Sequence, residues 1–295
     1  MPRAEGSDET VPMKDALAHC EALVCTADKD RFLTALFAPA ERRGALHALY
    51  AFNIEIARVR KIVREPLAGE IRLQWWNDAI AGQAAGEVQS NPVAAALLAA
   101  VARYELPPGL LTALIAARRF DLYNDPMRTS ADFNDYARAT SSAVIELAAR
   151  ILNPDDVPGL GGLAFHAGLA YAIAGLLKAF PVHAARGQLY VPVEVLERHG
   201  AHGQDFAARQ ATPELGAALA EMRLRARDHL AQAGRLLDGL PATMLPALLP
   251  VALTRPQLDR MERRDYDPFA PVETAPWRRQ WRLWRAARKP SRIFA

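Results

Sequence analysis

Apolar residues recur at three- and four-residue spacing along almost the whole chain, and this periodicity restricts the possible folds more than any other feature. Alanine, leucine and arginine, which favour helices, dominate, while alternating runs of β-branched residues are scarce. With 51% hydrophobic and 23% charged residues, the chain also has enough apolar surface for a substantial core. The sequence therefore predicts an all-α protein.

Proline, glycine and asparagine divide the chain into segments of helical length. We expect helices at about 14–26, 28–36, 40–64, 66–84, 92–104, 108–121, 130–152, 160–179, 212–238 and 244–264, with one more at 274–288. There is no internal repeat and no long linker before Pro271. The expected organisation is a flexible N-terminus at 1–13, one helical domain at 14–270 and a C-terminal arm at 271–295.

One apolar stretch is long enough to cross a bilayer. Val157 to Leu177 spans 21 residues without a formal charge. It contains five glycines, one proline and His166, and is rich in alanine rather than leucine. We interpret it as a buried helix, and a transmembrane span is the alternative.

The C-terminal arm concentrates positive charge. Residues 276–295 hold seven cations and no acid, and because the whole chain carries +3, residues 1–275 carry −4. Trp277, Trp281 and Trp284 fall at i, i+4 and i+7, on one helix face, and cations flank them, among them Arg278, Arg282 and Arg285. This pattern is typical of a helix at a membrane surface, and the alternative is that the tryptophans fold back onto the bundle. A nucleic-acid partner is not expected, because nothing else in the chain is basic or carries a recognition motif.

Four sequence blocks occur in a characteristic order. They are DRFLTALFAPAERRGALHALYAF at 30–52, IRLQWWNDAI at 71–80, YARATSSAVIELAARIL at 136–152 and GQLYVP at 187–192. Together they resemble the squalene/phytoene synthase family. The resemblance implies a helical bundle of the isoprenoid synthase type with a central cavity, in which two Asp-x-x-x-Asp motifs hold Mg²⁺ against the diphosphate of a prenyl substrate.

The positions that match those four aspartates have lost their carboxylates. They carry Ala57, Lys61, Ala179 and His183. Alanine offers no ligand, and a lysine ammonium about 5 Å from a divalent cation would oppose it by roughly 7 kcal/mol. No Asp or Glu lies between Asp156 and Glu194, so a shifted alignment does not restore the second motif. We therefore expect no metal site, no cofactor and no catalytic residue here; an active prenyl transferase that condenses isoprenoid diphosphates is the alternative.

A literal Asp-x-x-x-Asp does stand elsewhere, at Asp121 to Asp125. Asp125 precedes Pro126, which disfavours a helical backbone at that residue, so the two acids need not share a face. We interpret Asp121 as a structural residue that caps a helix end.

The substitutions at the motif positions suggest a different ligand chemistry. The predicted ligand-binding residues are Arg58, Lys61, Tyr136, Lys178, His183 and Arg186. Lysine and arginine bind phosphate oxygens without a metal, so the expected ligand is a prenyl diphosphate, a phospholipid headgroup or a quinone-related lipid. The alternative is that these cations are ordinary solvated helix residues.

The departures from the family pattern themselves resemble one branch of it. FNIEIA at 52–57, TSS at 140–142 and GLLKAFPVH at 175–183 are similar to a mitochondrial complex I assembly factor that has a squalene/phytoene synthase domain. The resemblance implies a non-catalytic protein whose partners are complex I subunits or assembly intermediates. The two cysteines are too few for a disulfide scaffold, and the first dozen residues resemble no targeting segment. The expected location is cytoplasmic, peripheral on the inner face of the inner membrane.

Overall fold

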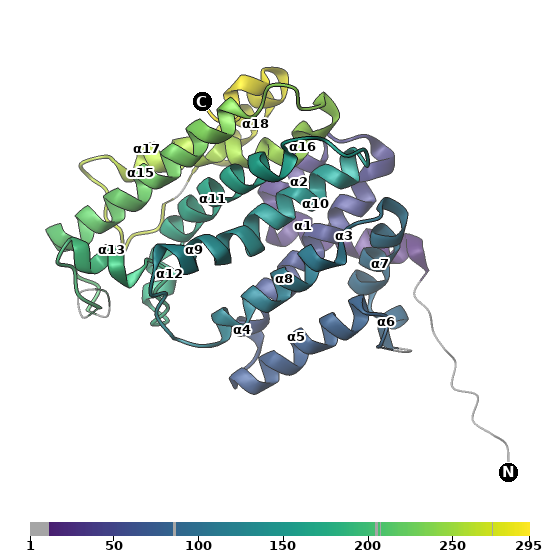
Figure 1. Ribbon diagram of the computed structural model, residues 1–295, viewed down its shortest axis with the longest axis horizontal. Helices are drawn as coiled ribbons and strands as arrows, with labels where there is room; N and C mark the ends of the chain where they lie inside the picture. Colours follow the sequence, from purple (N-terminus) through teal and green to yellow (C-terminus); the bar gives the residue numbers. More distant parts are fainter. Residues whose placement is uncertain (1–11, 85–86, 204–205, 207, 273) are drawn as a thin grey trace, which may run out of the picture.

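The computed structural model describes residues 12–84, 87–203, 206, 208–272 and 274–295 (Figure 1). Within these ranges every regular element is a helix and no strand is present. The all-α prediction is therefore confirmed. The flexible N-terminus predicted at 1–13 lies outside the described residues, except for Pro12 and for Met13, which begins the first helix.

The first half of the chain forms a group of short and medium helices. These are α1 (Met13–Ala27), α2 (Lys29–Ala35), α3 (Ala40–Ala57), α4 (Val59–Ile62), α5 (Pro66–Ile80), α6 (Glu87–Ser90), α7 (Pro92–Tyr104), α8 (Pro108–Arg118) and the 3-10 turn η1 (Phe120–Leu122). Three of them begin at a proline, whose fixed φ suits the first helical position. The Asn91 side chain caps α7 by accepting hydrogen bonds from two backbone amides.

The second half adds the longest helices and several irregular turns. The elements are α9 (Ser130–Ala137), η2 (Arg138–Ser142), α10 (Ala143–Leu152), α11 (Leu160–Lys178), α12 (Phe180–Ala184), α13 (Val193–Arg198), α15 (Pro213–Arg235), η3 (Ala242–Met244), α16 (Leu245–Leu248), η4 (Leu249–Leu253), α17 (Thr254–Met261), α18 (Pro276–Arg288) and η5 (Pro290–Arg292). The single helix predicted at 130–152 is interrupted by the π-helical turn η2. The helix predicted at 244–264 breaks into short turns because Pro246 and Pro250 lack backbone donors.

Helix α11 is the central element of the second half. It lies between α15 and α10 (Figure 1), and its Leu163, Ala167 and Ala170 are completely or almost completely buried. It approaches η2 closely, because Gly168 leaves room for the backbone of Ser142. By length and composition α11 is apolar enough to cross a membrane. Its burial within the bundle agrees with the interpretation as a core helix.

Candidate functional site

The residues of the site come from the end of α3, from α4, from the end of α11 and from α12. Ala57 is the last residue of α3 and Lys61 lies in α4, while Ala179 and His183 follow α11. The charge of Lys61 acts on the His183 imidazole. Two positions predicted from separate sequence blocks thus lie near one another in the fold.

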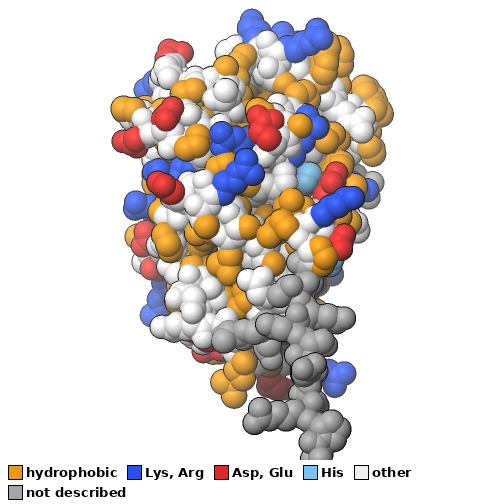
Figure 2. All heavy atoms as spheres, turned by 90° about the vertical axis from the view of Figure 1, so that its right-hand side faces the viewer, with side chains coloured by type: hydrophobic (Ala, Val, Ile, Leu, Met, Phe, Trp, Pro, Cys, Tyr) orange, Lys and Arg blue, Asp and Glu red, His pale blue; other side chains and the backbone are white. Residues whose placement is uncertain are grey.

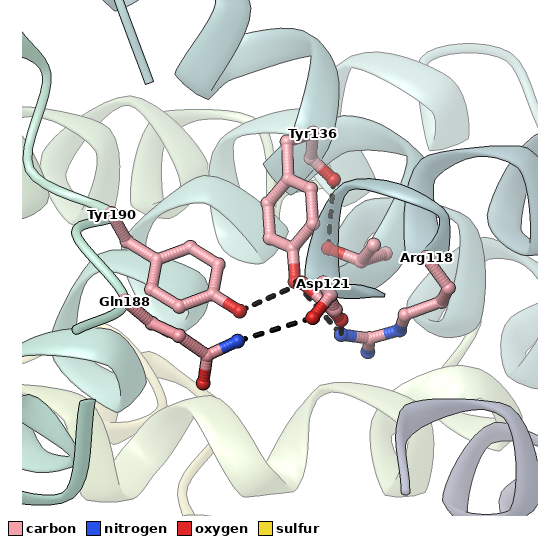
Figure 3. A network of polar contacts seen from close by, with 6 residues as sticks. Arg118, Asp121, Tyr136, Gln188 and Tyr190 are labelled. Atoms are coloured by element: carbon pink, nitrogen blue, oxygen red, sulfur yellow. Dashed lines mark hydrogen bonds and ion pairs between the residues drawn. The ribbon is translucent and has the colours of Figure 1, made fainter. Parts of the chain in front are cut away.

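A buried carboxylate, Asp121, is the centre of the polar network at this site (Figure 3). Its Oδ1 accepts hydrogen bonds from the Tyr136 hydroxyl at 2.9 Å and the Tyr190 hydroxyl at 2.7 Å. Its Oδ2 pairs with Nη1 of Arg118 at 3.1 Å, and the same nitrogen donates to the Tyr136 oxygen at 2.9 Å. Gln188 donates to the Asp121 backbone carbonyl at 3.1 Å. The interpretation of Asp121 as a helix cap is wrong, since its side chain binds phenols and a guanidinium from other elements.

Aromatic rings fill the space around this network. The His183 ring lies 4.6 Å from that of Tyr190, which lies 5.6 Å from that of Tyr136, and Phe120 packs edge-on against both tyrosines. Next to them is a cavity of about 10 Å³, lined by Phe133, Ile173, Leu176, Leu177, Phe180, His183, Gln188, Tyr190, Val191 and Met222. That volume holds one water molecule at most. The space directly beside His183 and Tyr190 is therefore nearly filled by side chains.

Burial controls the protonation of these groups. It raises the pKa values of Tyr136 and Tyr190, with the Asp121 charge adding to the effect, so both phenols stay neutral and donate hydrogen bonds. Burial also lowers the pKa of His183 to about 4, helped by Arg186 and Lys61 and opposed by Asp121. His183 is thus neutral at pH 7, so the positive charge beside it comes from Lys61 and Arg186.

The other predicted ligand residues separate into two groups. Lys61 and Arg186 are exposed beside His183. Arg58 forms an ion pair with Glu55 at 2.6 Å, and the charge of Lys178 acts on Asp30 in α2. The structure therefore places Lys61, His183 and Arg186 together with the Tyr136 network, while Arg58 and Lys178 have neighbouring carboxylates of their own.

The donor set does not suit the Mg²⁺ that the family resemblance implies. Mg²⁺ takes hard oxygen ligands, whereas the motif positions supply two methyl groups, an ammonium and an imidazole. The neighbouring Asp121 has both carboxylate oxygens engaged by protein donors. Across the described ranges, no three His, Cys, Asp or Glu side chains come together as a group that could hold a metal ion.

The C-terminal arm presents its tryptophans to solvent. Trp277, Trp281 and Trp284 in α18 are 63%, 51% and 39% exposed, while Leu283 and Ala286 on another face of the helix are buried against the bundle. The alternative in which the tryptophans fold back is wrong, because the small and aliphatic residues of α18 make the packing contact instead.

Comparison with known proteins gives the family. The sequence pattern of the Squalene/phytoene synthase family matches residues 24–285, and the chain belongs to that family. It is 30% identical over 257 residues to complex I assembly factor 6 of Rattus norvegicus, covering 87% of this chain and 77% of that protein, and 29% identical over 253 residues to the Homo sapiens protein, covering 86% and 76%. It is also 24% identical over 292 residues to 15-cis-phytoene synthase of Synechococcus elongatus, covering 94% of each chain.

Solved structures agree with the fold. Squalene synthase HpnC from Alicyclobacillus acidocaldarius superposes with a TM-score of 0.75 at 23% identity, covering 90% of this chain and 99% of that one. A dehydrosqualene synthase in complex with a ligand gives a TM-score of 0.81 at 17% identity, covering 94% and 97%. The bundle is thus of the isoprenoid synthase type, as expected from the sequence.

Sequence reasoning missed Arg118, Gln188 and the role of Asp121. Tyr190 stood within the GQLYVP block, but it served there only to mark the resemblance. The sequence did contain a signal for this network. Tyr136 and Tyr190 stand in two separate family blocks, and Asp121 is a carboxylate outside those blocks that could accept their hydrogen bonds. The hydrogen bond from Tyr190 to Asp121 spans 69 residues, a separation at which periodicity carries no information.

The neutral His183 predicts a pH dependence of stability. In the unfolded chain its pKa returns to its ordinary value near 6.5, so between pH 6.5 and about 4 the unfolded state binds more protons than the folded one. Stability that is complete above pH 6.5 should therefore fall as the pH drops towards 4. Changing His183→Gln should remove on the order of 1 kcal/mol from this acid-induced loss, measured by urea unfolding at pH 7 and pH 5. An unchanged difference between the two pH values would contradict a buried neutral His183.

Proposed function

We propose that this protein is a non-catalytic member of the squalene/phytoene synthase family that acts as an assembly factor for respiratory complex I. The observation that carries the proposal is the 30% identity to complex I assembly factor 6, which extends over 87% of the chain. The chemistry of the site supports it, since the motif positions lack carboxylates and the cavity beside His183 measures only about 10 Å³. Its partners are then complex I subunits or assembly intermediates, and its location is the inner face of the inner membrane.

Deletion of the gene tests the assembly role. We expect NADH:quinone oxidoreductase activity of isolated membranes to fall to a minor fraction of the parental level, because unassembled subunits do not transfer electrons to quinone. Succinate:quinone oxidoreductase activity in the same membranes is the control and should not change. Normal complex I activity and normal complex I bands on native gels in the deletion strain would remove the assembly role.

The second candidate is an active prenyl transferase, favoured by the 24% identity to 15-cis-phytoene synthase over 94% of the chain. On our proposal, the purified protein with farnesyl or geranylgeranyl diphosphate, Mg²⁺ and NADPH should release no pyrophosphate. Mass spectrometry should find no C30 or C40 hydrocarbon, while an active synthase run in parallel forms product. Turnover by the wild-type chain would make this protein an enzyme.

A small bound ligand is compatible with the non-catalytic role. Lys61 and Arg186 are exposed cations beside the aromatic rings of His183 and Tyr190, and a prenyl diphosphate, a phospholipid headgroup or a quinone-related lipid would supply the anionic or polar group they accept. Because the adjoining cavity is so small, a long isoprenoid chain requires the aromatic side chains to move apart. Extraction of the purified protein into organic solvent, followed by mass spectrometry, tests for such a ligand.

A further inference from the structure

A surface hollow lies between α17 and α18, away from the site just described. Its volume is about 260 Å³, and it is lined by Pro256, Asp259, Arg260, Arg263, Thr274, Ala275, Arg278 and Arg282. Four of these eight residues are arginines. The charges on this wall therefore decide what the hollow accepts.

Two of the lining charges already have partners. The Asp259 carboxylate forms an ion pair at 2.7 Å with Nη2 of Arg227, a residue of α15. Arg260 pairs with Asp265 at 2.8 Å. The positive charge of the hollow therefore comes mainly from the other three arginines, Arg263, Arg278 and Arg282.

Arg263, Arg278 and Arg282 have no ion pair with a carboxylate among the described residues. Partial burial lowers the pKa of Arg282, and the neighbouring Arg278 charge lowers it further while Asp259 opposes the shift. The guanidinium remains charged at pH 7, since the ordinary arginine pKa lies far above it. Three arginines that form no ion pair within the described residues, around a hollow whose wall carries the single acid Asp259, are a site for an anion with several oxygens, such as a phosphate.

The tryptophan face of α18 adjoins this arginine row. At 3.6 residues per turn, Trp277, Trp281 and Trp284 lie on one strip of the helix, and Arg278 and Arg282 lie on the strip next to it. The rings of Trp281 and Trp284 stack at 5.1 Å, and Arg288 lies over the Trp284 ring at 4.2 Å. In the space-filling view, cationic and apolar side chains gather at the upper end of the molecule, where Figure 1 places α18 (Figure 2).

An anionic bilayer offers a binding partner to both the tryptophan strip and the arginine strip of α18. Indole rings partition into the headgroup layer, and adjacent guanidinium groups reach the lipid phosphates. A free phosphate would neutralise the hollow but leave three large indoles exposed to water. The opposite face of α18 anchors the helix to the bundle through Leu283 and Ala286, and Arg279 adds an ion pair to Asp30 at 3.1 Å, so the outer face is held in a fixed orientation.

We propose that α18 lies in the headgroup layer of an anionic bilayer, with its tryptophan face inserted and one lipid phosphate held in the hollow by Arg263, Arg278 and Arg282. The inference specifies how the membrane location proposed above is achieved. It does not depend on the assembly role, so the two are tested separately.

Flotation of the full chain with liposomes tests the inference. Wild-type protein should float with phosphatidylcholine vesicles that contain a minority of cardiolipin, and it should remain at the bottom with phosphatidylcholine alone. The triple variant Trp277→Ala, Trp281→Ala, Trp284→Ala should bind the anionic vesicles more than roughly tenfold less well, because the apolar contact with the bilayer is lost. Arg263→Gln, Arg278→Gln and Arg282→Gln should each weaken binding about fivefold.

Matched controls come from α5 and the residues before it, on a different part of the surface. Leu67→Ala with Ile71→Ala removes two exposed apolar side chains, and Arg64→Gln with Arg72→Gln removes two exposed cations. Neither pair should change flotation. Near-equal thermal unfolding of all variants shows that the effects are not loss of fold, since every substituted side chain in α18 is solvent-exposed.

Three results of the vesicle comparisons would overturn the inference. They are flotation unaffected by the tryptophan variant, equal losses in the α5 controls, and equal binding to neutral and anionic vesicles. Displacement from vesicles by inorganic phosphate at equal ionic strength would assign the hollow to a free anion instead. Retention by single-stranded nucleic acid rather than by vesicles would assign the tryptophans to base stacking. If flotation fails while gene deletion still lowers complex I activity, this inference is lost and the assembly role remains.

Discussion

Changing Gly168→Ala is expected to lower the free energy of unfolding by about 3 kcal/mol, at the upper end of the usual range for overpacking a core. An added methyl group would lie within 2.5 Å of the Oγ, Cα and N atoms of Ser142. Two of these atoms belong to the backbone of η2, so the clash cannot be relieved by rotating a side chain. α11 must separate from η2, and the packing of the longest apolar helix in the described chain is then disturbed. Urea unfolding monitored by circular dichroism measures the loss.

Gly175→Ala is the matched control, because it adds the same methyl group to the same helix. No atom outside the helix's own backbone and the adjacent residues lies within 4 Å of the new methyl group, and Gly175 is exposed. Alanine there should be neutral or stabilise by about 0.5–1 kcal/mol through its higher helix propensity. If Gly168→Ala and Gly175→Ala have similar effects, α11 does not pack on η2 as described.

This contact also shows why some features of the fold were predictable and others were not. Helix periodicity and proline positions predicted α7, α8 and α11 to within a few residues, since those signals are local. The π-helical turn η2 was not predicted, because the run from Ala137 to Ala143 contains no local breaker. What holds Ser142 there is its fit against Gly168, a contact between segments 26 residues apart.

The candidate site likewise has features that the sequence could predict and features that it could not. The motif positions and Tyr136 could be identified because each lies within a recognisable block, and the exposed side of α18 agrees with the spacing of its tryptophans. The protonation of His183 could not be predicted, since it depends on how deeply the ring is buried beside Tyr190. Asp121 was misread because its partners come from α8, α9 and the loop before α13.

Replacing Asp121 by alanine is expected to cost about 3–5 kcal/mol, because it removes one partner from a buried ion pair. The Arg118 guanidinium would be left without its carboxylate, and two phenol hydroxyls would lose their acceptor. Asp125→Ala is the matched control: the same change, four residues away, at an exposed side chain. It should shift the free energy of unfolding by less than about 0.5 kcal/mol. Equal effects of the two changes would contradict the buried network.

A double-mutant cycle separates the network from the bulk of the side chains. Tyr190→Phe keeps the ring but removes the hydroxyl, which should cost about 1 kcal/mol in the wild-type background. In the Asp121→Ala background the Tyr190 hydroxyl has lost its carboxylate acceptor, so the same change should cost clearly less than in the wild-type background. A smaller cost in the Asp121→Ala background means that Tyr190 donates its hydrogen bond to Asp121 in the folded state. A carboxylate bound in this way holds the Tyr136 and Tyr190 rings in place beside His183. Additive effects would mean that Asp121 is free to bind something else.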